Sequence, residues 1–167
     1  MKTVLYCLGN PGNLSKTRHS IGLMFADYLA SARFTDCKVI KSKMHMNESG
    51  RDIRQLRDCL MLAAADDLDS PFGKITIKTS PSAKGHNGLK SLIKETNGKN
   101  VVLYKLFIGI DRPASKDPDI VSQYVLSKFN RAEMRDLDEL VFPQAAKILS
   151  QHIREWHASQ TSNNASL

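Results

Sequence analysis

The sequence has 167 residues, of which 41% are hydrophobic and 25% charged, and its formal net charge is +7. This length suits one domain of ordinary size, and the composition excludes a disordered, collagen-like or coiled-coil protein. No apolar run approaches the roughly 20 residues that a membrane-spanning helix requires. Because the first residues enter a strand pattern without a signal-peptide or transit-peptide pattern before it, we expect a protein that is not secreted.

The cysteines and the charges point to a class of partner. Three cysteines (Cys7, Cys37 and Cys59) without a CxxC pair argue against a disulfide framework or a zinc site, and favour a reducing compartment. Nine basic and two acidic side chains in residues 71–116 account for the whole excess of +7. Such a localised positive field is typical of nucleic-acid binding, although composition alone fits a solvated lysine-rich surface equally well.

The amino-terminal part of the chain predicts alternating strands and helices. An apolar, β-rich run at residues 3–8 ends in a glycine- and proline-containing turn and predicts a buried strand. Periodic apolar residues that follow residue 20 predict a helix that ends near residue 33. Residues 38–46 alternate weakly and indicate a strand, and residues 48–60 have a helical pattern.

The rest of the chain continues the alternation. Buried or half-exposed strands are predicted at residues 61–65, 74–78 and 101–110, with a helix at residues 87–95 between the last two. Asn130 and Glu133 form a capping-box pattern for a helix that ends near residue 141, and Pro143 suits the first turn of another helix.

These elements predict a single α/β domain over residues 1–158, with a mixed twisted sheet between helices, and a frayed polar tail at residues 159–167. In such sheets, ligands bind outside the carboxyl ends of the strands. Polar side chains follow strand or turn patterns, or lie near a predicted helix start, at Asn10, His19, Asn47, Asp66 and His86-Asn87.

This set of side chains fits the activation of water by a general base. The sequence has no serine in a Gly-x-Ser-x-Gly elbow, no P-loop and no metal-ligand spacing. A histidine with a carboxylate fits a base whose tautomer the carboxylate holds, and neutral amides can bind a peptide backbone or an oxyanion. Simpler interpretations exist: His19 as a helix-start residue, Asn10 as a turn former, and the other asparagines and one of the aspartates after residue 65 as caps.

Short motifs occur in one order along nearly the whole chain. They are Leu8-Gly9-Asn10-Pro11-Gly12, Thr17-Arg18-His19, Met46-Asn47-Glu48-Ser49-Gly50, Asp66-Asp67-Leu68-Asp69, Gly85-His86-Asn87-Gly88-Leu89, Ile108-Gly109-Ile110 and Tyr124-Val125-Leu126-Ser127-Lys128-Phe129. Together they resemble the peptidyl-tRNA hydrolase family of the bacterial and organellar type. The resemblance implies hydrolysis of the ester between a peptide and the terminal ribose of tRNA, without a cofactor or a metal ion.

The resemblance also implies roles for individual residues. It makes His19 the general base and Asp66 its orienting carboxylate. It makes Asn10 and Asn87 the residues that position the ester and the water, and Asn47 the residue that holds the substrate backbone. Lys78 matches a family position that contacts tRNA phosphate, and from their charge we expect Lys84 and Lys105 to extend this contact. We expect a monomer that acts on peptidyl-tRNA in translation and ribosome rescue, in the cytoplasm or mitochondrion.

The chain departs from the family pattern at Ser20, Ala65, Phe107, Asp111 and the loop at residues 80–84. The segment between His19 and Asn47 is also shorter than in the family, which predicts a trimmed sheet with an exposed edge. If this shortening moves Asn47 away from His19, the chain is a catalytically idle RNA-binding relative. An amidase or esterase that acts on small acyl substrates is a further alternative, and it would not need the basic segment.

Overall fold

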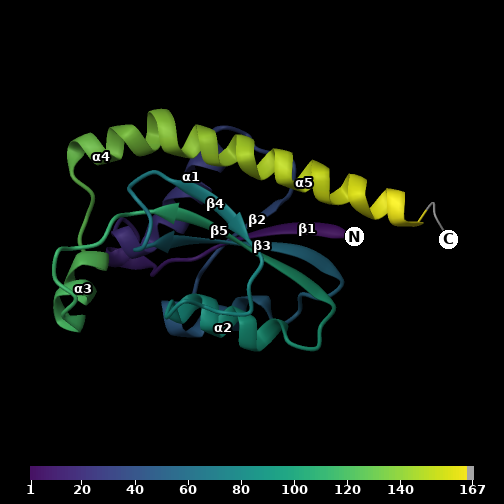
Figure 1. The fold of residues 1–167 in the computed structure, drawn as a ribbon, viewed down its shortest axis with the longest axis horizontal. Coiled ribbons are helices and arrows are strands. Elements are labelled where there is room, and N and C mark those ends of the chain that lie inside the picture. The colour runs from purple at the N-terminus through teal and green to yellow at the C-terminus, as the bar shows by residue number, and fades with distance from the viewer. Residues whose placement is uncertain (165–167) are drawn as a thin grey trace.

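The computed structural model describes residues 1–164, which form a five-stranded sheet with helices on both faces (Figure 1). The strand order is β2-β1-β3-β5-β4. Four strands are parallel: β1 (Lys2–Cys7), β2 (Lys38–Lys41), β3 (Cys59–Asp67) and β5 (Val101–Gly109). Strand β4 (Ile75–Lys78) is antiparallel to β5. The predicted single α/β domain with a mixed sheet is confirmed.

Helices cover the two faces of the sheet unequally (Figure 1). Helices α1 (Ile21–Ser31) and α5 (Phe142–Asn164) lie on one face, and α2 (Asn87–Thr96) lies on the other with the 3₁₀ segment Met46–Ile53. The connection from β5 to α5 contains α3 (Pro118–Val125), α4 (Arg131–Asp136) and the π-helical turn Leu137–Val141. No helix within residues 1–164 has the length and apolarity needed to span a membrane.

The central strands send alternate side chains into two apolar layers. In β1, Leu5 and Cys7 belong to the layer under α1 and α5, whereas Tyr6 belongs to the layer under α2, which also contains Leu8 just after the strand. Every residue of β3 is buried, as expected for a central strand of a sheet that is covered on both faces. Because β3 ends in aspartates, it brings carboxylates to the carboxyl edge of the sheet with little exposure to water.

The helix predicted at residues 48–60 is wrong. Residues Met46–Ile53 form a 3₁₀ helix, and Cys59 already begins β3. Asp58 has a φ of +53°, a left-handed conformation that interrupts helical geometry, and Cys59 and Leu60 are buried with the apolar run that follows them. Burial of this run in the sheet therefore outweighs the local helical pattern.

Three further elements differ from the sequence expectations. The strand predicted at residues 38–46 ends at Lys41. Helix α3 was not expected, although Asp117 caps it by accepting the N–H of Asp119 at 2.8 Å and Pro118 occupies its first position. The predicted frayed tail is helical as far as Asn164, and residues 165–167 lie outside the described part of the chain.

The shortened segment between His19 and Asn47 leaves β2 at the edge of the sheet. This strand has four residues, and its two terminal lysines, Lys38 and Lys41, are exposed. A short edge strand flanked by lysines discourages pairing with another chain. The predicted exposed edge is therefore present in a protected form.

Candidate active site

A cavity of about 660 Å³ lies at the carboxyl edge of the parallel strands. This is the place at which open α/β sheets bind their ligands. The predicted catalytic and substrate-binding residues that line it are Asn10, His19, Asn47, Asp66 and Asn87, and His86 lines it with them. The shortened segment therefore leaves Asn47 in the same cavity as His19.

The segment that follows β1 packs closely against the ends of the strands, and this packing positions His19. This residue lies in the 3₁₀ turn Arg18–Ser20, directly before α1. A Cβ atom at Gly22 would lie 2.4 Å from the carbonyl oxygen of Leu8 and 2.7 Å from that of Ala64. Only glycine allows this approach, so the start of α1 rests directly on the sheet.

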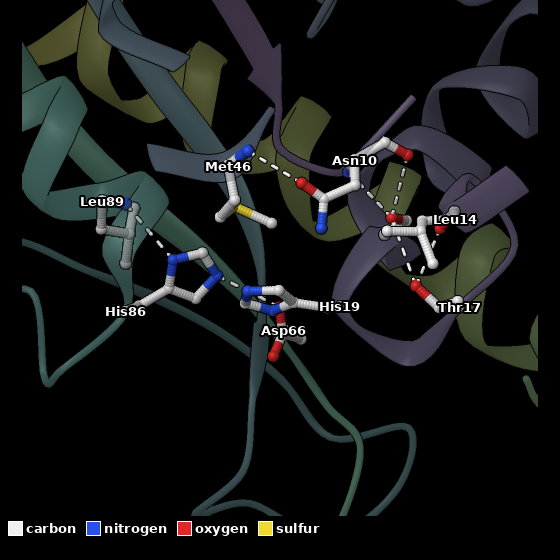
Figure 2. A network of polar contacts seen from close by, with 9 residues as sticks. Asn10, Leu14, Thr17, His19, Met46, Asp66, His86 and Leu89 are labelled. Atoms are coloured by element: carbon white, nitrogen blue, oxygen red, sulfur yellow. Dashed lines mark hydrogen bonds and ion pairs between the residues drawn. The ribbon is translucent and has the colours of Figure 1, made fainter. Parts of the chain in front are cut away.

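Asp66 binds two histidines through a single oxygen (Figure 2). Nδ1 of His19 lies 2.8 Å from Oδ1 of Asp66, and Nε2 of His86 lies 3.1 Å from the same oxygen. The centroids of the two imidazole rings are 4.8 Å apart. Because the side chain of Asp66 is only 3% exposed, these N–H groups replace the water that the carboxylate loses.

The hydrogen bonds assign a tautomer to each ring. The backbone N–H of Leu89 donates to Nδ1 of His86 at 3.3 Å, so the proton of His86 is on Nε2 and is donated to Asp66. His19 donates its Nδ1 proton to Asp66, which leaves a lone pair on Nε2. His19 can therefore act as a base, whereas His86 is a fixed donor.

His86 has two functions that the sequence did not predict. It, rather than Asn87, caps α2, and it supplies the second hydrogen bond to Asp66. Its place in the Gly85-His86-Asn87 motif was the only signal in the sequence, because its distance from Asp66 depends on the tertiary fold.

The pKa values of the pair follow from burial and from the close contact. Burial acts to lower the pKa of His19, but the hydrogen bond and negative charge of Asp66 outweigh it and raise the pKa above the ordinary 6.5. Burial acts to raise the pKa of Asp66, but the two histidines hold it well below its usual range. Asp66 is therefore ionised, and His19 becomes an available base at pH values above its raised pKa.

His19, Asp66 and His86 also have the composition of a metal site. One ligand atom from each lies within 4.8 Å of the others. However, a metal ligand needs a lone pair, and Nε2 of His86 carries a proton because Nδ1 accepts the N–H of Leu89. The geometry therefore fits a hydrogen-bonded triad better than a metal centre.

Two backbone contacts orient the amide of Asn10 (Figure 2). The backbone N–H of Asn10 donates to Oγ of the buried Ser20 at 2.9 Å, and the side-chain Oδ1 of Asn10 accepts the backbone N–H of Met46 at 2.8 Å. With Oδ1 engaged, Nδ2 is the group that remains for a ligand. The amides of Asn47 and Asn87 are exposed and bond to no other part of residues 1–164.

The structure separates Asp66 from its acidic neighbours. Asp67 accepts the backbone N–H of Asp69 at 3.0 Å and the hydroxyl of Ser70 at 2.8 Å. Asp67 thus caps the turn after β3, whereas Asp66 faces the histidines.

The three predicted tRNA-binding lysines have different environments. Lys78 and Lys84 are exposed, and within residues 1–164 neither forms a salt bridge. Lys105 is fully buried, and its ammonium donates to the carbonyl oxygens of Ser80 and Ser82. This burial argues against a phosphate contact by Lys105, which instead anchors the loop that carries Lys84.

Comparisons with known proteins show the family of this chain. A family model described as peptidyl-tRNA hydrolase matches residues 4–166. The chain belongs to the peptidyl-tRNA hydrolase family. A probable peptidyl-tRNA hydrolase of Schizosaccharomyces pombe is 32% identical over 170 residues, which cover 89% of this chain and 82% of that protein. The peptidyl-tRNA hydrolase of Leuconostoc mesenteroides is 32% identical over 163 residues, with coverage of 82% and 85%.

A crystal structure gives the same result for the fold. The peptidyl-tRNA hydrolase of Acinetobacter baumannii superposes with a TM-score of 0.71 at 25% identity, over 97% of this chain and 91% of that one. The resemblance recognised in the sequence is therefore confirmed. The shortened segment does not interrupt the peptidyl-tRNA hydrolase fold.

Proposed function

We propose that this chain hydrolyses the ester bond between the peptide and the tRNA of peptidyl-tRNA, and releases both. The hydrogen bond between His19 and Asp66 carries the proposal, because it leaves Nε2 of His19 as a base in a cavity lined by neutral amides. Membership of the peptidyl-tRNA hydrolase family supports this substrate.

The reaction uses water and groups of this chain. A water molecule gives a proton to Nε2 of His19 and attacks the carbonyl carbon of the ester. Nδ2 of Asn10 donates to the oxyanion of the tetrahedral intermediate. When the intermediate collapses, the bond between this carbon and the ribose oxygen breaks, and the imidazolium of His19 returns its proton to that oxygen. Asp66 stabilises the imidazolium between the two proton transfers.

The amides select for a blocked amino group. Asn47 and Asn87 offer donors and acceptors that suit the peptide backbone, and neither carries a charge. The aspartates that line the cavity already have partners, such as the two histidines on Asp66 and Arg112 on Asp69. The free ammonium of an unblocked aminoacyl-tRNA would therefore lose water without gaining a free carboxylate. We therefore expect slow turnover of unblocked aminoacyl-tRNA.

The exposed lysines supply contacts to the tRNA. Lys84 lines the cavity, and Lys78 lies at the end of β4, just before the loop that carries Lys84. Phosphate contacts of this kind provide affinity that does not depend on sequence and that falls with salt.

We further propose that a monomer acts in translation and ribosome rescue, in the cytoplasm or mitochondrion, with residues 1–158 as the functional domain. A mass near 18.6 kDa by light scattering supports the monomer, and a mass of twice that value contradicts it.

The test measures peptide release from N-acetyl-aminoacyl-tRNA. The native chain should release the acyl group, His19→Ala should lose this activity, and His157→Ala, a histidine of α5, should keep it. A folded native chain without turnover would leave the idle RNA-binding interpretation. Rapid turnover of small esters that salt does not affect would favour the esterase interpretation.

A further inference from the structure

Arg18 precedes the proposed base but is 9% exposed and packs under the cavity wall rather than lining the cavity. Its guanidinium forms two parallel contacts with Glu133: Nη1 to Oε1 at 2.9 Å and Nη2 to Oε2 at 3.0 Å. Its Nε donates to Oγ of Ser127 at 3.2 Å. A bidentate pair of this kind fixes direction as well as distance.

Two aromatic rings enclose the same guanidinium. Cζ of Arg18 lies 4.7 Å from the centroid of the Tyr124 ring and 4.8 Å from that of Phe129. The Tyr124 hydroxyl donates to the carbonyl oxygen of Ile110, the residue directly after β5, at 2.5 Å. Arg18 therefore joins the turn of His19 to α3, to the segment after it, and through Tyr124 to the sheet.

The backbone reinforces this connection. The N–H of Arg18 donates to the carbonyl oxygen of Ser127 at 2.9 Å, and Thr17 forms an antiparallel bridge with Lys128. The residue that follows Arg18 in the chain is His19, so a shift of this contact shifts the base.

Helix α3 depends on these contacts for its position. None of the residues of Pro118–Val125 is fully buried, and Tyr124 and Val125 at its end are the ones that pack partly against the core, so core packing holds this helix weakly. Yet Val121, Ser122 and Val125 line the cavity that contains His19.

We propose that Arg18 is a positioning residue that fixes α3 as a wall of the cavity relative to His19. The effect of Arg18 on turnover rests on the proposed function, whereas its effect on the position of α3 does not. A displacement of about 1 Å at a reacting centre can lower a rate roughly a hundredfold. Arg18 can therefore affect catalysis without contacting the substrate.

Hydrogen exchange tests the placement of α3. Arg18→Lys keeps the charge but loses the planar fork, and Glu133→Gln removes the charge of the partner. We expect amide exchange in residues 118–128 to become at least tenfold faster in each variant, with exchange in α2 unchanged. Arg135→Lys, an exposed arginine on the same helix as Glu133, is the matched control and should behave as the native chain does.

Single-turnover kinetics with N-acetyl-aminoacyl-tRNA test the effect on the reaction. Arg18→Lys and Glu133→Gln should each lower the rate constant at least tenfold at temperatures well below unfolding, and the double variant should lose little more than either one. The affinity for deacylated tRNA should stay within twofold, a result that general destabilisation would not give.

Unchanged exchange in residues 118–128, or a native rate constant in both variants, would overturn the proposal. If the native chain itself releases no peptide, the proposed function fails, and the exchange measurements still decide whether Arg18 positions α3.

Discussion

The two sides of the cavity are held in place by different interactions. The proposed catalytic wall, called the catalytic wall below, consists of Asn10, His19, Asp66 and His86 and rests on the strand ends. Asp66 bonds to both histidines at 2.8–3.1 Å, and Asn10 bonds to Met46 at 2.8 Å. The outer wall, which consists of α3 and the loop at residues 79–85, is largely exposed and is held by Arg18 and Lys105. The difference separates a largely buried part, to which we assign the chemistry, from an exposed part that is held by a few side chains and that we expect to receive the substrate.

The largest expected effect comes from the charge at the centre of the catalytic wall. Asp66→Asn keeps the shape but removes the negative charge that stabilises the imidazolium of His19, so kcat should fall roughly 10²–10⁴-fold. A native rate in a folded Asp66→Asn variant would show that the catalytic wall does not depend on this charge.

The same variant changes the dependence on pH. Native kcat/KM should rise with pH through a midpoint above 6.5, because the base must be neutral and Asp66 raises its pKa. In Asp66→Asn the midpoint should move to lower pH. Asp67→Asn, which alters only the cap of a turn, should leave the midpoint where it is. Equal midpoints in all three proteins would contradict the assignment of His19 as the base.

A smaller loss is expected from the amide of Asn10. Asn10→Asp preserves the size and the acceptor for Met46 but replaces the Nδ2 donor by an oxygen. Loss of one oxyanion donor lowers kcat by about 10²–10³-fold, with little change in KM. If only KM increases, Asn10 binds the ground state of the substrate and the proposed oxyanion contact is wrong.

On and next to the outer wall, the salt dependence of tRNA affinity distinguishes lysines that bind phosphate from lysines that hold the structure. Lys78→Ala and Lys84→Ala should each lower the slope of log affinity for tRNA against log salt by about one, as expected for the loss of a phosphate contact. Lys105→Met should leave this slope unchanged, because its ammonium is buried against carbonyl oxygens. A lower slope for Lys105→Met would restore it as a phosphate ligand.

The smallest effect should come from the end of α5. A chain that ends after Ala158 keeps the hydrogen bond of 2.8 Å between Thr3 and His157 and lacks only the polar end of the helix. Its kcat/KM should stay within twofold of that of the full chain. A larger loss would extend the functional domain beyond residue 158.

The buried strands could be predicted from the sequence because burial on both faces leaves a continuous apolar run. The apolar run of β3 and the mostly apolar run of β5 follow this pattern. Helix α3 has eight residues and none is fully buried, so its few apolar residues at helical spacing and its capping residues gave a weak signal. At residues 48–60 the local pattern favoured a helix, but Cys59 and the apolar residues that follow it are buried in β3 instead.

The site could be predicted only as a set of residue types. Motif order identified His19 and Asp66, but the second histidine on Asp66 depends on how α2 approaches the sheet. Charge could not show that Lys105 faces inward and Lys84 outward. The direction of a side chain is a property of the tertiary fold, and this is the information that the sequence lacked.

Nitrogen NMR of the histidine rings tests the central claim most directly. Above its pKa, His19 should carry its proton on Nδ1 with a bare Nε2, while His86 should carry its proton on Nε2. The Asp66→Asn variant should have a lower pKa of His19. A neutral His19 protonated on Nε2 would have no lone pair facing the substrate, and this result would contradict its role as the general base.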